Sequence, residues 1–185
     1  MLQDSLAALG SVPVSRRVLL AAPEDHGVAV LRAFAPPGWE VLPQVGDDLG
    51  ARMARAFRTL GVSGEAVVLV GSDAPTVPLA PVTRALPRLA GARRALLGPA
   101  DDGGYLLLGL TSFDAAIFRD IPWSTHLVLD HTRARLRDAG YSVEELPSWY
   151  DVDEPADLER LRAEVRAHPE RAPRTAGILS DLVGS

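Results

Sequence analysis

Short apolar runs alternate along the chain with longer stretches in which apolar residues recur every three or four positions. The short runs are typical of buried strands, and the longer period is typical of helices that cover a sheet. The predicted strands cover residues 17–22, 39–42, 66–70, 95–97, 105–110 and 143–146. The predicted helices cover residues 2–9, 28–34, 47–60, 78–89, 127–139, 156–165 and 176–183. This alternation predicts an α/β fold with a mostly parallel, doubly wound sheet.

The length of 185 residues suits a single domain. Proline and arginine become frequent after His168, so we expect the domain to cover residues 1–168. Residues 169–185 are then expected to form a C-terminal linker and a short helix.

The composition of the chain argues against several classes of function. The net charge of −5 argues against a nucleic-acid partner, and the absence of cysteine excludes disulfides and thiolate catalysis. No apolar run approaches the ~20 residues of a membrane-spanning helix, and no signal peptide is recognisable. The scattered histidines lack the spacing of a helical zinc site. We therefore expect a globular cytoplasmic protein.

An acidic residue follows the most apolar predicted strand. The run Val-Val-Leu-Val at 67–70 leads into Gly71, Ser72, Asp73 and, after Ala74, a proline. In open α/β sheets ligands bind beyond the carboxyl ends of the strands, so Asp73 is a candidate for holding a nucleotide or its metal. The alternative is that its side chain only caps a local turn.

Two later segments add acidic residues. The segment 98–110 places two acids and two glycines before another apolar strand. Asp151 and Asp153 alternate just before a predicted helix, so both side chains face one direction and suit one cation. The competing interpretation is helix capping by Asp153 or Glu154, with Asp157 complementing the helix dipole. Carboxylate oxygens favour Mg²⁺ or Mn²⁺.

Several motifs occur together in a fixed order. They are Gln44 with the run DLGARM at 48–53, GSDAP at 71–75, PADDGGYLLLGL at 99–110, WST at 123–125 and DVDEPADL at 151–158. By these motifs the chain resembles the GT-A-like nucleotide-diphospho-sugar transferase superfamily, and within it the bacterial arsenosugar-biosynthesis-type glycosyltransferases. The resemblance covers roughly residues 4–161. It implies a Rossmann-like GT-A three-layer sandwich.

The resemblance also implies roles for single residues. Asp73 and Asp153 correspond to metal ligands, with Asp151 a neighbouring candidate, and Asp102 to a general base on the acceptor hydroxyl. The implied nucleotide-binding residues are Gln44, Gly50, Arg52, Ser72 and Asp73. The implied acceptor side consists of Gly103, Gly104, Tyr105 and Trp123, although core packing explains Trp123 equally well.

One departure from the family pattern concerns the start of the chain. Relatives begin with a strand and a basic, glycine-containing loop that cradles the phosphates, whereas this sequence begins with the following helix. All nineteen basic residues are arginine, so no lysine replaces the one in that loop. A misassigned start and a loss of donor binding both remain open. We expect the missing strand to leave apolar surface exposed or covered by a partner, as in a homodimer.

The function that the resemblance implies is metal-dependent transfer of a sugar from a nucleotide-diphosphate donor to a small acceptor. One alternative is a nucleotidyltransferase acting on a small phosphorylated or sugar-acid substrate. The other is a non-catalytic binding module that has lost the donor phosphate loop.

Overall fold

The structure, a computed structural model, describes residues 1–24, 26–61 and 64–181. The strands are β1 (Val18–Ala21), β2 (Glu40–Pro43), β3 (Val67–Val70), β4 (Arg94–Pro99), β5 (Tyr105–Leu110) and β6 (Ser142–Glu145). The α-helices are α1 (Leu2–Gly10), α2 (Gly27–Arg32), α3 (Leu49–Leu60), α4 (Leu79–Ala85), α5 (Val128–Asp138), α6 (Pro155–Ala167) and α7 (Pro173–Asp181). Short 3₁₀ turns cover Leu86–Arg88, Ala115–Phe118 and Pro169–Arg171. The alternation of strands and helices predicted from the sequence is confirmed.

The main sheet has the order β3-β5-β4-β6. Strand β5 runs antiparallel to both β3 and β4, whereas β4 and β6 are parallel. Consequently β3, β4 and β6 share one direction, as expected for a mostly parallel sheet, and β5 is the exception. The reason is that β4 and β5 form a hairpin, which needs only a short turn where a parallel pair needs a long crossover.

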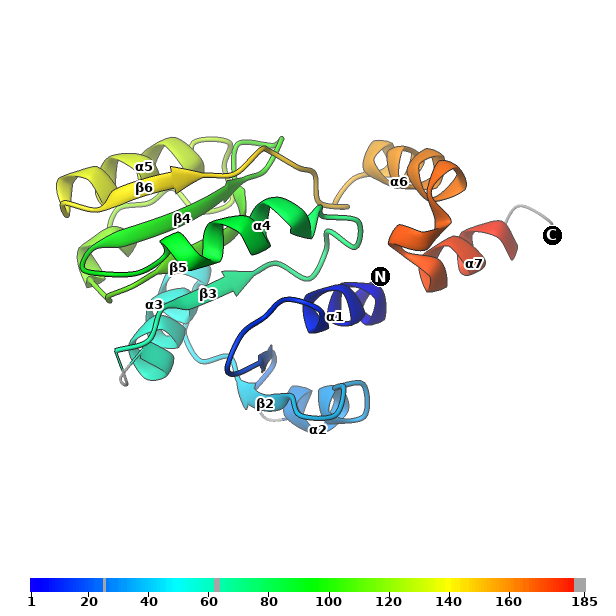
Figure 1. The fold of residues 1–185 in the computed structure, drawn as a ribbon, viewed down its shortest axis with the longest axis horizontal. Helices are drawn as coiled ribbons and strands as arrows, with labels where there is room; N and C mark the ends of the chain where they lie inside the picture. The colour runs from blue at the N-terminus through cyan, green and yellow to red at the C-terminus, as the bar shows by residue number, and fades with distance from the viewer. Residues whose placement is uncertain (25, 62–63, 182–185) are drawn as a thin grey trace.

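Helices cover both faces of this sheet (Figure 1). On one face, apolar residues of β4 and β5 pack with Met53 and Phe57 of α3 and Leu136 of α5. On the other face, the intervening strand residues pack with Val82 and Ala85 of α4. Successive strand residues point to opposite faces, so one apolar run supplies both cores. The expected three-layer α/β sandwich is confirmed.

Strands β1 and β2 form a separate parallel pair. Within the described residues, neither of these strands is hydrogen-bonded to a strand of the main sheet. Strand β3 was predicted to be buried, yet all four of its residues are only half-buried. The physical reason is that β3 pairs with β5 alone and is therefore an edge strand.

The C-terminal helices pack against each other beyond the carboxyl end of the sheet, near the N-terminus (Figure 1). Helix α7 begins at Pro173, three residues before the predicted start, and residues 182–185 lie outside the described chain. The buried carboxylate of Asp4 in α1 accepts hydrogen bonds from Thr175 N (2.8 Å), Thr175 Oγ1 (2.7 Å) and Arg174 N (3.2 Å). The first and last helices are thereby joined. Among the helices of the described residues, none is long and apolar enough to span a bilayer.

Candidate functional site

Three acidic segments meet at the carboxyl ends of β3, β4 and β6. Asp73 follows β3, Asp102 lies in the turn after β4, and Asp151 and Asp153 follow β6. Backbone hydrogen bonds join the segments. Val152 N donates to the Asp73 carbonyl (3.1 Å), and Asp101 N donates to the Trp149 carbonyl (2.9 Å). Residues almost eighty positions apart are thus held on one rim of the sheet.

Carboxylate oxygens of Asp73, Asp151 and Asp153 all lie within 4.8 Å of one another. Burial raises the pKa of Asp73, and the charges of Asp153 and Asp102 raise it further. Burial also raises the pKa of Asp151 to about 6, with the neighbouring carboxylates adding to the effect. Among the described residues, no ion pair neutralises the three side chains. Asp73 and Asp151 are half-buried and Asp153 is exposed, and such clustered carboxylate oxygens without a cationic partner fit a hard divalent metal ion.

The side chain of Asp73 hydrogen-bonds within its own residue and does not cap a turn formed by its neighbours. The structure gives its carboxylate no hydrogen bond to another described residue, and Oδ1 lies over the backbone of Gly71. A Cβ atom on Gly71 would stand 2.8 Å from this oxygen. Glycine at position 71 therefore permits the carboxylate to fold back toward the other acids.

The start of α6 is capped by acids outside the cluster, with Glu154 at the N-cap position and Asp157 completing a capping box. Asp157 Oδ2 accepts hydrogen bonds from Glu154 N (2.9 Å) and Asp153 N (3.3 Å), and Pro155 occupies the first turn of α6. The two interpretations of this motif therefore hold for different residues. Asp157 stabilises the start of the helix, and the carboxylates of Asp151 and Asp153 are left for the cluster.

The turn between β4 and β5 is stabilised by the side chain of Asp102 and packs closely against the segment before α5. Asp102 is exposed, and its Oδ1 accepts a hydrogen bond from Gly104 N (2.7 Å). Gly103 has φ +91°, and a Cβ there would stand 2.2 Å from the carbonyl oxygen of His126. Glycine is required at 103 by both conformation and space. Asp102 is close enough to the cluster for its charge to raise the pKa of Asp73 and Asp151.

Two residues assigned to the acceptor side pack partly against the hydrophobic core. The hydroxyl of Tyr105 contacts Met53 Sδ at 3.6 Å, and burial strongly raises its pKa. This hydroxyl therefore points into the interior. Trp123 packs against the first turn of α3, where a Cβ on Gly50 would stand 2.4 Å from its Nε1. Core packing thus accounts for much of Trp123, and the acceptor roles of both residues stay predictions.

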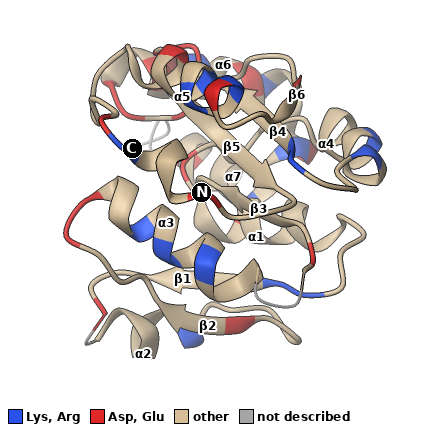
Figure 2. Cartoon of the chain, turned by 90° about the vertical axis from the view of Figure 1, so that its left-hand side faces the viewer, with Lys and Arg blue, Asp and Glu red and all other residues tan. Residues whose placement is uncertain are grey.

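The implied nucleotide-binding residues Gln44, Gly50 and Arg52 lie on the loop after β2 and the start of α3. Arg52 Nε donates to the Gly46 carbonyl (2.9 Å), and Asp48 caps α3 by accepting from Ala51 N (2.7 Å). The arginines of α3 are the basic bands along this helix in Figure 2. The loop is thereby held in one conformation.

The contact of Gly50 with Trp123 places this loop beside the acceptor segment. Ser72 lies next to the acidic cluster, with an exposed side chain, and its carbonyl accepts a hydrogen bond from Ser5 Oγ (3.2 Å). The nucleotide-binding roles themselves stay predictions.

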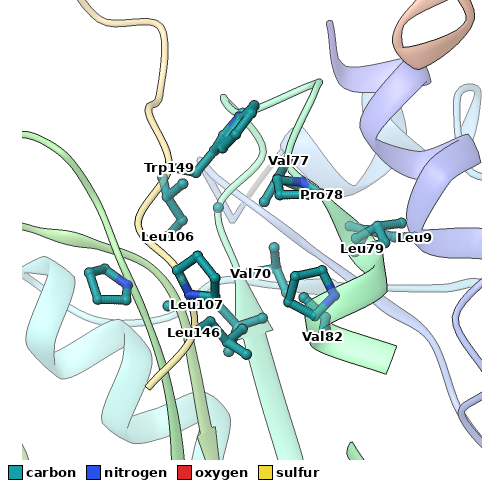
Figure 3. A pocket seen from close by; sticks show the side chains of 16 residues that line it. Leu9, Val70, Val77, Pro78, Leu79, Val82, Leu106, Leu107, Leu146 and Trp149 are labelled. Carbon is teal, nitrogen blue, oxygen red and sulfur yellow. The ribbon is translucent and has the colours of Figure 1, made fainter. Parts of the chain in front are cut away.

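A narrow apolar pocket lies behind the rim, between α1, α4 and the sheet (Figure 3). Leu9, Val70, Leu106 and Trp149 are among its lining residues. Trp149 Nε1 already donates to Thr76 Oγ1 (3.4 Å), and the lining includes no charged side chain. The pocket therefore lacks the polar groups that would orient a polar ligand, and we interpret it as a gap in the packing.

Sequence reasoning missed a polar network beneath the cluster. Glu164 Oε2 accepts hydrogen bonds from Thr76 Oγ1 (2.8 Å) and Tyr150 Oη (2.5 Å). The sequence feature that could have indicated this network is the position of Glu164 between Leu161 and Val165, the two buried residues of α6. A charged residue in an apolar helix stripe indicates a paired, buried group.

Comparison with known proteins identifies the family and the fold. The model of a family described as uncharacterized proteins conserved in bacteria (DUF2064) matches residues 5–125. A solved structure from Desulfovibrio desulfuricans G20, named "putative nucleotide-diphospho-sugar transferase", is 33% identical with a TM-score of 0.86, covering 97% of this chain and 78% of that one. None of the curated proteins matches.

Two more distant structures share the fold alone. 4-Diphosphocytidyl-2C-methyl-D-erythritol synthase is 16% identical with a TM-score of 0.57, covering 88% of each chain. The homologue of a Mycobacterium tuberculosis protein from Mycobacterium sp. strain JC1 is 20% identical with a TM-score of 0.56, covering 90% of this chain and 83% of that one. The family match and the 33%-identical relative together show that the chain belongs to the bacterial DUF2064 family, with the fold of the nucleotide-diphospho-sugar transferases.

Proposed function

We propose that the protein transfers a sugar from a nucleoside-diphosphate donor to a small acceptor, with Mg²⁺ or Mn²⁺ held by Asp73, Asp153 and Asp151. The convergence of these three carboxylates within 4.8 Å, on the rim where α/β sheets bind ligands, carries the proposal. The name of the relative from Desulfovibrio desulfuricans supports the class of donor.

In this proposal, different residues of the rim bind the metal ion, the nucleotide and the acceptor. When bound, the metal ion supplies positive charge to the diphosphate leaving group. Gln44 and Gly50 contact the nucleobase, and Arg52 and Ser72 lie toward the phosphates. The proposed role of Asp102 is to take the proton from the acceptor hydroxyl, since its hydrogen bond to Gly104 N fixes the carboxylate while leaving it exposed. Gly103, Gly104 and Trp123 border the acceptor.

The first test is a thermal-shift titration with Mn²⁺, alone and with nucleoside-diphosphate sugars. A ligand that binds only the native state raises the melting temperature Tm. We expect Asp73→Asn to abolish the Mn²⁺-dependent rise. Asp101→Asn is the matched control, because Asp101 pairs with Arg160 (2.8 Å) outside the cluster and its loss should leave the rise intact. A wild-type Tm that does not respond to Mn²⁺ would contradict the metal site.

Product analysis then separates the alternatives. Release of nucleoside diphosphate supports sugar transfer, whereas release of pyrophosphate from a nucleoside triphosphate indicates nucleotidyl transfer to a phosphorylated or sugar-acid substrate. The fold shared with 4-diphosphocytidyl-2C-methyl-D-erythritol synthase makes triphosphates a necessary part of the panel. Donor binding without turnover would instead favour a binding module.

A further inference from the structure

The half-buried carboxylate of Glu164 bridges the two segments that carry the acidic cluster. Its Oε2 accepts from the hydroxyls of Thr76 and Tyr150, and its Oε1 accepts from Arg171 Nη1 (2.6 Å). Thr76 and Tyr150 are themselves buried, with exposed fractions of 4% and 3%. The two hydroxyls are therefore shielded from water, which strengthens their hydrogen bonds to the carboxylate.

Both partners are close in sequence to cluster residues. Thr76 follows Asp73 by three positions, and Tyr150 directly precedes Asp151. The segments are also joined directly, by a backbone bond from Val152 N to the Asp73 carbonyl (3.1 Å) and by the bond from Trp149 Nε1 to Thr76 Oγ1 (3.4 Å). The Glu164 bridge adds a further attachment between the segments, in which the acceptor is a carboxylate.

The rest of α6 anchors the bridge. Leu161 and Val165, on either side of Glu164, are buried in the C-terminal core with Tyr150. Burial alone raises the pKa of the Glu164 carboxyl, but its bonds to Tyr150, Arg171 and Thr76 lower the pKa below the ordinary value. An ionised carboxylate has only acceptor atoms, which suits the donor groups around it.

We propose that Glu164 is a positioning residue that fixes the separation of Asp73 and Asp151 through Thr76 and Tyr150, so that the carboxylates meet one divalent cation. This inference rests on the metal site proposed above. It assigns the network a role in metal affinity that is separate from its role in stability, as residues behind metal ligands commonly have.

A matched pair of tyrosines separates the two roles. Tyr150→Phe removes a buried hydroxyl from the bridge. Tyr141→Phe removes the hydroxyl of another buried tyrosine, which donates to the Ser112 carbonyl (2.6 Å). Tyr141 directly precedes β6 and therefore lies at the end of this strand opposite Asp151. Both changes remove a tyrosine hydroxyl of a buried residue together with its hydrogen bonds, so both should lower Tm. Only the first should change the metal site.

The test measures Mn²⁺ affinity by calorimetry and the spectrum of bound Mn²⁺ by electron paramagnetic resonance. We expect Tyr150→Phe and Thr76→Val each to weaken Mn²⁺ binding about tenfold or more and to alter the spectrum. Tyr141→Phe should bind as wild type does, despite its lower Tm. Thr76→Val nearly preserves the shape of the side chain, so the test does not depend on a Glu164 variant that fails to fold.

The outcomes are distinct. Wild-type affinity and spectrum in both Tyr150→Phe and Thr76→Val would overturn the positioning role and leave the metal site standing. Equal weakening by Tyr141→Phe would also overturn it, because general loosening would then explain the effect. A wild-type chain that binds no Mn²⁺ would overturn the metal site and the positioning role together.

Discussion

At the scale of single residues, Asp151 makes the metal-free protein sensitive to pH. Its pKa is raised from 3.8 to about 6 by burial and by the charges of Asp102, Asp153 and Asp73. The folded state therefore binds this proton more tightly than the unfolded state, and the free energy of unfolding decreases as pH rises from about 4 to about 6. We expect Asp151→Asn to raise the Tm of metal-free protein by about 2 °C at pH 7, and to raise it less as the pH is lowered toward 4. Melting curves in a chelator over this pH range measure the effect.

The matched control for this prediction has the opposite sign. A hydrogen bond from Arg160 lowers the pKa of Asp101 below its ordinary value, so its ionised form stabilises the folded state at neutral pH. Asp101→Asn should therefore lower Tm slightly at pH 7, and the loss should shrink as the wild-type carboxyl becomes protonated. Shifts of the same sign in both variants would contradict an origin in local charge.

The proximity of three carboxylates could be predicted from the sequence because it depends only on their position relative to the strands. Asp73, Asp151 and Asp153 each follow the carboxyl end of a strand, and the topology of an α/β sheet brings such positions together. Sequence reasoning could not determine that the Tyr105 hydroxyl points into the core or that Glu164 reaches Thr76. Both depend on side-chain directions across elements distant in sequence.

At the scale of elements, two helical glycines should respond to alanine in opposite ways. Gly50, in the first turn of α3, touches Trp123 so closely that a Cβ would stand 2.4 Å from the indole nitrogen. Gly50→Ala should lower stability by about 1–3 kcal/mol through overpacking. Gly177, inside α7, has nothing within 4 Å of its would-be Cβ, so Gly177→Ala should raise stability by about 0.5–1 kcal/mol. Urea denaturation followed by circular dichroism compares them, and stabilisation by both changes would contradict the packing of Trp123 on α3.

Most elements were predictable because apolar runs and periods are local properties of the sequence. The exceptions have identifiable causes. The helix predicted over residues 78–89 ends at Ala85 and continues as a 3₁₀ turn that contains Pro87, a residue without the backbone N–H that a helix interior uses. The apolar run at 67–70 predicted a strand but not its half-exposed position, since exposure depends on which strands pair with it.

At the scale of the whole molecule, the order β3-β5-β4-β6 shows what local patterns do not contain. The pairing of β3 with β5 joins Val67 to Leu110, and that of β4 with β6 joins Arg94 to Ser142. Such distant pairings are set by competition among all strands for partners, which no single segment encodes. The layered fold was predictable from the alternation of elements, whereas the order and the exposed edges required the structure.

The two ends of the chain are coupled through Asp4, and this coupling is testable. Asp4 in α1 accepts three hydrogen bonds from Arg174 and Thr175 in the first turn of α7, which makes it a helix cap supplied by a distant segment. Asp4→Ala should cost about 1–2 kcal/mol, as for other lost caps, and lower Tm by about 4 °C. Hydrogen exchange should accelerate in α7 and not in α3, whose own cap, Asp48, is local. If exchange in α7 were unchanged, Asp4 would be dispensable for holding this helix, and the contacts of α7 with α6 would have to hold it alone.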